Sequence, residues 1–444
     1  MTAAERAPGQ GTFSLMMRAF KYRNYRLFFG GQGISLIGTW MQRIALSWLV
    51  YRLTGSAMLL GVVGFCGQIP IFVLAPFAGV LADRMDRHRI LLATQTLFML
   101  QAFTMSYLVL SHRIQVWEII AISVFIGLVN AFDTPARQSF VIDMVSRKED
   151  LGNAIALNSS MFNSARLIGP SVAGVVIGIT GEGACFLIDA ISYLAVLAAL
   201  LAMDPIAPGP RPREEDVFRR LKEGFSYTFG FAPIKLVILL LALTSLTGMP
   251  YTVLMPVFVK ETLHSGPGAM GFLMAFSGAG ALLAAVTLAS RRNAAGLEGR
   301  IPLAGLIFGS GLILLSLSRG FPSAAAFIAL ASFGMITQMA SSNTIIQTLV
   351  DDDKRGRVMS IYTMAFLGMA PFGSFLAGWG ASHIGVEYTI MLSGAMSLAG
   401  AALFSARLGE IREKARPVYQ RLGIVPEVAA GVETASELTA PPED

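Results

Sequence analysis

The sequence predicts an all-α polytopic membrane protein whose twelve transmembrane helices form two pseudo-symmetric six-helix bundles. Of its 444 residues, 54% are hydrophobic and 14% are charged, and the mean hydropathy is +0.62. This composition excludes a soluble fold. The apolar residues form runs long enough to cross a hydrocarbon core, which takes about 20 residues. None of these runs alternates with the two-residue period of a membrane β-barrel.

Twelve apolar runs of helical length follow one another along the chain. They cover residues 27–50, 57–82, 90–111, 116–142, 152–180, 184–203, 236–259, 270–290, 301–317, 322–350, 358–384 and 386–405. The longest polar segment between runs, residues 204–235, separates six of them from the other six. An equal division of this kind suggests a parallel pseudo-repeat.

We therefore expect an N-terminal segment, a first bundle, a linker, a second bundle and a C-terminal tail. Their expected bounds are 1–26, 27–203, 204–235, 236–406 and 407–444. The linker has the apolar spacing of a surface-lying amphipathic helix over residues 214–229. The acidic stretch from residue 426 is expected to be disordered.

The distribution of Lys and Arg predicts the orientation in the membrane. Of the 34 Lys and Arg residues, 27 lie on the side of the two termini, four lie on the opposite side, and three lie inside spans. Both termini are therefore expected in the cytoplasm, in a plasma membrane of the bacterial inner-membrane type. The sequence pI of 9.4 is then explained by basic residues that contact the anionic inner leaflet of the lipid bilayer. Nucleic-acid binding has no support.

The sequence does not favour an enzyme. No Lys follows a Gly, so there is no phosphate-binding loop for ATP. The four histidines lie in or beside loops, and Cys66 and Cys185 both lie inside spans, which favours neither a metal site nor a disulfide. We expect no cofactor, no metal, no ATP and a monomer whose partners are the lipid bilayer and a small-molecule substrate.

Charged residues inside spans are the strongest candidates for function, because each costs roughly 2.5 to 3.5 kcal/mol at a helix centre and must face a partner or a water-filled cavity. They are Arg43, Asp133, Arg137, Arg166 and Asp189, all in the first half. The second half offers neutral groups such as Gln338. We therefore expect a cavity with one charged wall and one mostly apolar wall.

Helical spacing groups polar residues into two stripes. Gln32, Thr39 and Arg43 recur on one face of the first span, and Asn163 and Arg166 on one face of the fifth. With Asp189 at a comparable depth, these residues form the expected substrate or proton pathway. Two alternatives remain open: the stripes hold helices together, or Arg43 snorkels outward past Trp48 while Arg166 and Asp189 pair for structure alone.

Between the second and third spans, the residues from Gly79 to Arg87 follow the pattern Gly-x-Leu-Ala-Asp-Arg-x-x-Arg. This hairpin resembles the signature loop of the major facilitator superfamily of secondary transporters, although Asp86 stands where the signature usually has glycine. The resemblance implies that the hairpin contacts the fourth and eleventh spans and controls opening to the cytoplasm. The expected gate residues are Gly79, Asp83, Arg84 and Arg87 of the hairpin, with Asp133 and Arg137 of the fourth span. The alternative is a charge anchor that fixes topology.

Further motifs resemble one branch of this superfamily, the transmembrane secretion effectors, which include enterobactin exporters and macrolide efflux pumps. They lie at residues 39–43, 47–56, 131–138, 153–159 and 165–170. The resemblance runs from about Phe13 to Arg416. Gly169, Pro170 and Gly174 resemble the end of the antiporter signature and are the expected helix-bend residues, although Ala173 replaces one of its glycines.

We therefore expect a proton-coupled exporter of a small amphipathic molecule, such as a drug, a siderophore or a secondary metabolite, that works by alternating access. Asp189 is the first candidate for the proton carrier and Asp133 the second. One alternative is an importer of a small organic anion, suggested by three buried Arg against two Asp. The other is a membrane receptor or assembly protein that transports nothing.

Overall fold

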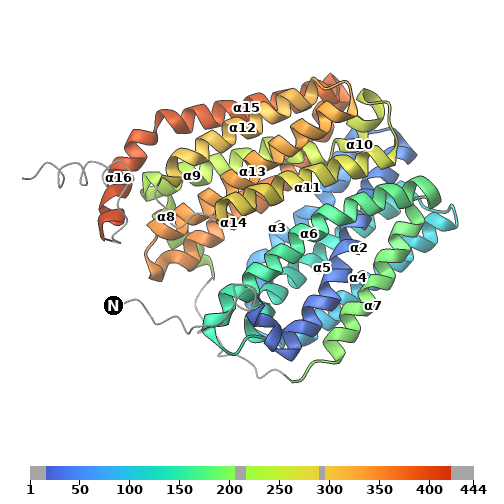
Figure 1. Cartoon of the computed structure of the whole chain (residues 1–444), viewed down its shortest axis with the longest axis horizontal. Coiled ribbons are helices and arrows are strands. Elements are labelled where there is room, and N and C mark those ends of the chain that lie inside the picture. Colours follow the sequence, from blue (N-terminus) through green and yellow to red (C-terminus); the bar gives the residue numbers. More distant parts are fainter. Residues whose placement is uncertain (1–16, 206–216, 290–295, 422–444) are drawn as a thin grey trace, which may run out of the picture. The chain divides into compact units, whose positions relative to one another are not determined.

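The computed structural model describes residues 17–205, 217–289 and 296–421, and within these ranges the regular structure is entirely helical (Figure 1). Twelve long helical segments follow one another, which confirms the predicted fold class. They are α2 (Arg23–Thr54), α3 (Ala57–Arg84), α4 (Arg87–Leu110), α5 (Val116–Asp143), α6 (Lys148–Thr180), α7 (Glu182–Leu201), an interrupted helix over Ala232–Thr262, α11 (Pro267–Ala289), α12 (Leu297–Ser316), α13 (Phe321–Leu349), α14 (Asp352–Ile384) and α15 (Val386–Ala406).

Among the described residues, ten of these segments are long and apolar enough to cross a membrane. The remaining two, α2 and α4, carry polar side chains that the fold buries. In α2 these include Gln32, Ser35 and Gln42, and in α4 they include Thr94, Gln95, Gln101 and Ser106. The low average hydropathy of both helices therefore comes from side chains that face other helices instead of lipid.

Short polar turns connect the helices. Asp86 is the N-cap of α4, and its carboxylate accepts hydrogen bonds from the backbone N–H groups of His88 at 3.0 Å and Arg89 at 3.4 Å. Aspartate is one of the preferred residues at this position, which explains how the hairpin accommodates it in place of glycine. Gly181 and Gly385 each have a φ of 86° and join α6 to α7 and α14 to α15, so the same turn occurs in both halves of the chain.

The seventh span is not the continuous helix that its apolar run suggests. It consists of α9 (Ala232–Leu243), a π-helical turn η2 (Thr244–Gly248), a 3-10 turn η3 (Met249–Thr252), α10 (Met255–Val257) and a second π-helical turn η4 (Phe258–Thr262). Pro250 and Pro256 lie in the irregular part and supply no backbone N–H for the helical ladder. A Cβ on Gly373 of α14 would lie 2.3 Å from the carbonyl oxygen of Leu246, so α14 packs closely against this segment.

The chain forms two compact units, and α2 and α3 contribute to both. The first unit comprises Met1–Leu46 and Val73–Arg213, and the second comprises Ser47–Phe72 and Glu214–Asp444. The core of the first unit includes Tyr25, Phe28 and Phe140, and the rings of Phe28 and Phe140 meet edge to face at 6.0 Å. Each long helix α2 and α3 therefore passes from one packing environment to another along its length.

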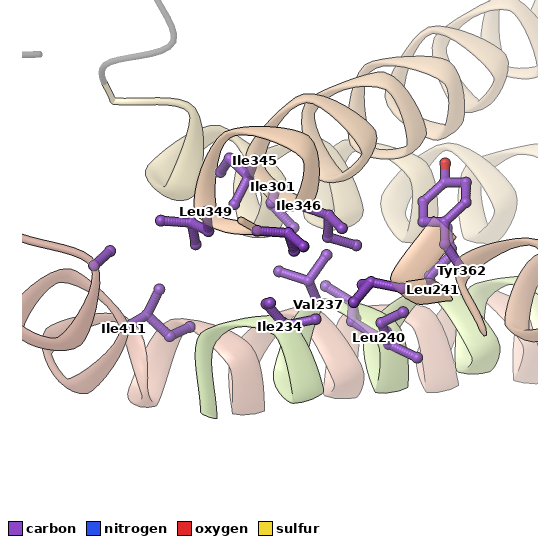
Figure 2. Close-up of a cluster of buried hydrophobic side chains, with 14 of the residues drawn as sticks. Ile234, Val237, Leu240, Leu241, Ile301, Ile345, Ile346, Leu349, Tyr362 and Ile411 are labelled. Carbon is purple, nitrogen blue, oxygen red and sulfur yellow. The ribbon is translucent and has the colours of Figure 1, made fainter. Parts of the chain in front are cut away.

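The core of the second unit gathers side chains from six helices, part of which Figure 2 shows. Ile234 and Val237 of α9 face Ile345, Ile346 and Leu349 of α13, and Ile301 of α12, Tyr362 of α14 and Ile411 complete the cluster. Ile411 belongs to α16 (Leu408–Arg421), an additional helix after the last span. Burial raises the pKa of Tyr419, on the same buried face of α16, above its usual value.

Ion pairs attach the flanking helices to the ends of the spans. Within the second unit, Arg421 of α16 bonds Asp351 at 3.0 Å, and Arg357 of α14 pairs at 2.8 Å with Glu223 of α8 (Val217–Gly230). In the first unit, Lys21 of η1 (Arg18–Lys21) pairs with Asp150, and the bond to Asp150 raises the pKa of Lys21. Helices outside the membrane are thus fixed to specific spans.

Helix packing in the second unit predicts which glycines tolerate a side chain. A Cβ on Gly280 of α11 would lie 2.1 Å from the carbonyl oxygen of Ala329 in α13, whereas a Cβ on Gly356 of α14 would meet nothing within 4 Å. We expect Gly280→Ala to lower the melting temperature in detergent, with a cost of about 1 to 3 kcal/mol from the forced separation of the two helices.

Gly356→Ala is the matched control, because alanine there relieves the entropy cost of glycine in a helix and should leave stability unchanged or raised by up to about 1 kcal/mol. Equal melting temperatures for the two variants would contradict the close packing of α11 on α13.

Candidate functional site

Asp133 of α5 is held by donors from two helices. Its side chain is 2% exposed. Thr94 Oγ1 and Gln95 Nε2 of α4 each donate to Asp133 Oδ1 at 2.8 Å, and Arg137 Nε lies 3.3 Å from Oδ2. The expected contact between Asp133 and Arg137, one helical turn apart, is therefore present. The carboxylate joins α4 to α5 with two hydrogen bonds, and its ion pair with Arg137 lies within α5.

Asp189 of α7 has a different environment. It is fully buried, and Ser192 Oγ lies 3.5 Å from Oδ1 while donating to the backbone carbonyl of Asp189 at 2.7 Å. Within the described part of the chain, Oδ2 has no hydrogen-bond partner. A Cβ on Gly38 of α2 would lie 2.6 Å from Oδ1, so the glycine allows α2 to approach the carboxylate.

The hydrogen bond described for the Asp189 carboxylate comes from Ser192, and the suggested pairing of Arg166 with Asp189 stays a prediction. Arg166 of α6 lies over Trp40 of α2, with Cζ 5.8 Å from the ring centre. Arg43 of α2 lies over the same ring at 5.0 Å. We call Trp40, Arg43 and Arg166 the Trp40 cluster.

Close packing of α2 on α6 fixes the position of the Trp40 cluster. A Cβ on Gly169 would lie 2.5 Å from Trp40 Cβ and 2.9 Å from the carbonyl oxygen of Ile37. The ring of Phe162 meets that of Trp40 edge to face at 5.8 Å. Gly169, predicted as a helix-bend residue, therefore also permits the contact that positions Trp40. Pro170 follows it inside α6.

The polar stripe of α2 contacts neighbouring helices of the first unit. Thr39 Oγ1 donates to the Ser35 carbonyl at 3.0 Å and lies 3.3 Å from the hydroxyl of Tyr193 in α7. Gln42 Nε2 donates to Gln101 Oε1 of α4 at 3.1 Å, and Gln32 is buried. These contacts fit the alternative in which the polar stripe holds helices together. Arg43, further along α2, is exposed instead.

In α6, Asn163 donates to the carbonyl of Ser159 at 2.8 Å, one turn earlier in the same helix. The side chain of Asn163 is half-buried, as is that of Arg166. Gly174 lies one turn after Pro170 in the same helix. The pathway roles of Gln32, Thr39, Arg43, Asn163, Arg166 and Asp189 stay predictions.

The signature hairpin is described in part. The surroundings of Gly79 and the side chains of Asp83 and Arg84 lie outside what the structure describes. Arg87 NH1 donates to both carboxylate oxygens of Asp143, the last residue of α5, at 2.9 and 2.8 Å. The hairpin is thus tied to the end of the fourth span, and its role as a gate stays a prediction.

Sequence reasoning missed several partners in this region. Trp40, Gln101, Asp143 and the donors Thr94 and Gln95 were not singled out as site residues. One signal was available: the third span carries Thr94, Gln95 and Gln101, which is unusually polar for a membrane helix. In the described ranges, no group of three His, Cys, Asp or Glu side chains could hold a metal ion.

In the second unit, the C-terminal part of α2 and the N-terminal part of α3 pack on later helices. A Cβ on Gly61 of α3 would lie 2.9 Å from Gly378 Cα of α14, and Gln68 Nε2 donates to Ser374 Oγ at 3.2 Å. Tyr51 donates to Glu261, and Lys260 Nζ lies 5.6 Å from the Tyr51 ring. We call the contact of α3 with α14 the glycine seam.

Comparison with known proteins gives consistent matches over most of the chain. A family model described as transmembrane secretion effector matches residues 16–436. The staphyloferrin A transporter of Staphylococcus aureus is 28% identical over 373 residues, covering 83% of this chain and 92% of the relative. Macrolide efflux protein A of Streptococcus pyogenes is 24% identical, covering 88% and 98%. The multidrug efflux pump Tap of Mycolicibacterium fortuitum is 24% identical, covering 87% and 95%.

Solved structures match the fold. A bacterial homolog of the human lysosomal transporter Spinster aligns with a TM-score of 0.71 at 14% identity, covering 88% of this chain and 98% of that chain. A POT family transporter aligns with a TM-score of 0.70 at 12% identity, covering 91% and 98%. At these identities, the likeness shows the fold alone.

The Asp133 contacts predict a measurable energetic coupling between α4 and α5. Asp133→Ala and Thr94→Val should each lower the melting temperature in detergent, because each leaves a buried polar group without its partner. The double variant should be less destabilised than the sum of the two, with a coupling of about 0.5 to 3 kcal/mol.

Thr104→Val is the control for this cycle, because the hydroxyl of Thr104 donates within its own helix, to the Leu100 carbonyl. Additive losses for Asp133→Ala and Thr94→Val would show that this hydrogen bond contributes nothing to stability.

Proposed function

Because the chain belongs to the transmembrane secretion effector family of the major facilitator superfamily, we propose that it is a proton-coupled exporter of a small amphipathic molecule. The multi-pass helical fold and the efflux proteins among its relatives support transport by alternating access. We propose a bacterial plasma membrane with both termini in the cytoplasm, on the strength of the Lys and Arg distribution.

The observation that carries this proposal is the contrast between two buried carboxylates. Asp133 accepts bonds from Thr94 and Gln95 and pairs with Arg137, which suits a structural or gating role. Asp189 has one long contact, with Ser192, and an oxygen without a partner in the described residues. Ionisable residues at membrane depth mark proton and substrate pathways, so Asp189 is our proton carrier.

We assign the moving contact on the extracytoplasmic side to the glycine seam. With cytoplasmic termini, residues 47–72 lie toward the outer surface, where α3 meets α14 through Gly61, Gly378 and the bond from Gln68 to Ser374. In a membrane, close packing stabilises such a contact between helices, but the hydrophobic effect contributes little to it because lipid is equally apolar. Opening of this side would break that hydrogen bond, the small-residue contact and the ring contacts of Phe65 and Phe72 with α14.

Export is proposed over import because relatives are described as a macrolide efflux protein and a multidrug efflux pump. Uptake of an organic anion is the second candidate, favoured by the two guanidinium groups at Trp40. Everted vesicles separate the two directions, because export then appears as accumulation inside the vesicles. Labelled erythromycin and citrate serve as probes of the macrolide and organic-acid classes.

Asp189→Asn should abolish accumulation driven by an imposed pH gradient in these vesicles while downhill exchange of the same probe continues, because the amide cannot carry a proton. Asp204→Asn, which changes an exposed carboxylate after the sixth span, is the control and should retain accumulation. If Asp189→Asn still concentrates the probe against its gradient, the coupling site lies elsewhere.

Asp83→Asn should leave the protein inserted and folded while reducing transport by about tenfold or more, because the neutral side chain loses its charge contact at the proposed gate. Asp86→Asn is the matched control on the same hairpin, since asparagine also caps helices. Initial uptake rates, normalised to the amount of protein in the membrane, test this. Unchanged transport by Asp83→Asn would remove the aspartate from the gate.

A further inference from the structure

Helix α8 lies where two spans begin. Only Phe231 separates its last residue, Gly230, from Ala232, the first residue of the seventh span. The middle of α8 also lies beside the start of the eleventh span, since a Cβ on Gly224 would be 3.1 Å from the carbonyl oxygen of Arg357 in α14. Figure 1 shows α8 next to α9 and α14, and all three helices belong to the second unit. Two points along α8 are therefore held at the boundary of the membrane.

Contacts with α14 fix which way α8 faces. Glu223 pairs with Arg357 at 2.8 Å, and Lys354 Nζ lies 4.8 Å from the ring centre of Tyr227. Thr228 is fully buried. With 3.6 residues per turn, the contacting residues of α8 share one side of the helix. A rotation of α8 would break these contacts, so the direction of its other side is also fixed within the second unit.

That other side carries two aromatic rings and a positive charge. Phe225 and Phe229 are each 41% exposed, and their rings stack with centres 5.8 Å apart and an angle of 7° between the planes. Lys222 is exposed and lies three residues before Phe225, which places all three on one face. Apolar rings in water are unfavourable, whereas aromatic residues beside Lys are typical of a helix lying in the membrane interface. We call Lys222, Phe225 and Phe229 the lipid face.

We propose that the lipid face binds anionic phospholipid, with the lipid phosphate at Lys222 and the first acyl carbons against Phe225 and Phe229. Lys binds phosphate as a point charge, and anionic lipids attract basic residues next to a span. The sequence predicts a surface-lying helix in this segment, and the structure identifies its lipid-binding face. This assignment does not depend on the substrate, direction or coupling of transport.

Bound lipid has a consequence for the eleventh span. The side of α8 opposite the lipid face contacts Arg357 and Lys354, both in the first turns of α14. A lipid that holds α8 in the membrane interface therefore also holds the start of α14 at that depth.

Insertion of the lipid face is tested in full-length protein reconstituted in phosphatidylcholine nanodiscs. Cys66→Ala and Cys185→Ala remove the two cysteines, and a nitrobenzoxadiazole label is then attached to either Phe229→Cys or Gly230→Cys. The label at 229 should be protected from reduction by aqueous dithionite, because the apolar face of an interfacial helix lies about 5 to 10 Å below the surface.

Gly230→Cys is the matched control. Gly230 is exposed on a different face of the same helix, and a Cβ there would meet nothing within 4 Å. Its label should react faster with dithionite than the label at 229. Equal reaction rates at the two positions overturn the proposal, because neither side of α8 then enters lipid preferentially.

The lipid class is tested with the label at 229 and a small, equal mole fraction of doxyl-labelled phosphatidylglycerol or phosphatidylcholine. Phosphatidylglycerol should quench the label about threefold to fivefold more, because one Lys near the surface enriches anionic lipid by about this factor. Lys222→Gln should remove the preference and Lys222→Arg should retain it, whereas Arg113→Gln, in an exposed loop of the first unit, should change nothing. Equal quenching by the two lipids, or a preference that survives Lys222→Gln, overturns the anionic assignment.

A second measurement keeps both rings in place. Wild-type protein in nanodiscs containing phosphatidylglycerol with a diazirine in its acyl chain is photolysed, and the modified peptides are identified by mass spectrometry. Adducts are expected within residues 222–231 and should decrease when Phe225→Ser and Phe229→Ser are combined, since both side chains are exposed and their loss leaves the core intact. The absence of adducts in this segment of the wild-type protein overturns the proposal.

Discussion

A polar side chain inside a hydrocarbon layer must find a partner, and in the first unit this requirement determines which helices touch. Asp133 joins α5 to α4 through Thr94 and Gln95. Gln42 joins α2 to α4 through Gln101, and Thr39 contacts Tyr193 of α7. Apolar contact between helices gives little net drive when lipid is equally apolar. The specific hydrogen bonds therefore fix the arrangement in which Arg43 and Asp189 acquire their surroundings.

The second unit also packs its helices through small residues. Gly280 allows α11 to approach Ala329 of α13, and Gly309 and Gly394 allow α12 to approach α15. Its buried polar contacts are between neutral groups, such as Gln338 with Thr244 at 2.8 Å. The charged residues inside spans thus lie in the first half of the chain, as in the sequence, whereas close packing through glycines occurs in both units, at Gly169 in the first and at Gly280 in the second.

Apolar runs were enough to predict the twelve spans, because length and hydropathy are local properties of the chain. Helical spacing likewise predicted the contact of Arg137 with Asp133. It could not identify Thr94 as a partner of Asp133, because a face of a helix does not specify which helix will cover it. The interruption of the seventh span and the contact of Arg166 with Trp40 also depend on tertiary packing around Gly373 and Gly169.

The two spans that bury most of these polar side chains, α2 and α4, are long enough to cross a membrane but are also the two that fall short of the hydropathy typical of such a helix in the described chain. A nascent helix enters the bilayer according to the summed transfer free energy of its residues. Since the partners of Gln42 and Thr39 are supplied by α4 and α7, which are synthesised after α2, the first helix gains its full lipid compatibility when the sixth arrives. Biogenesis of the first unit is therefore cooperative: its helices settle in the bilayer as a group, and a substitution that breaks one polar contact acts on insertion as well as on transport.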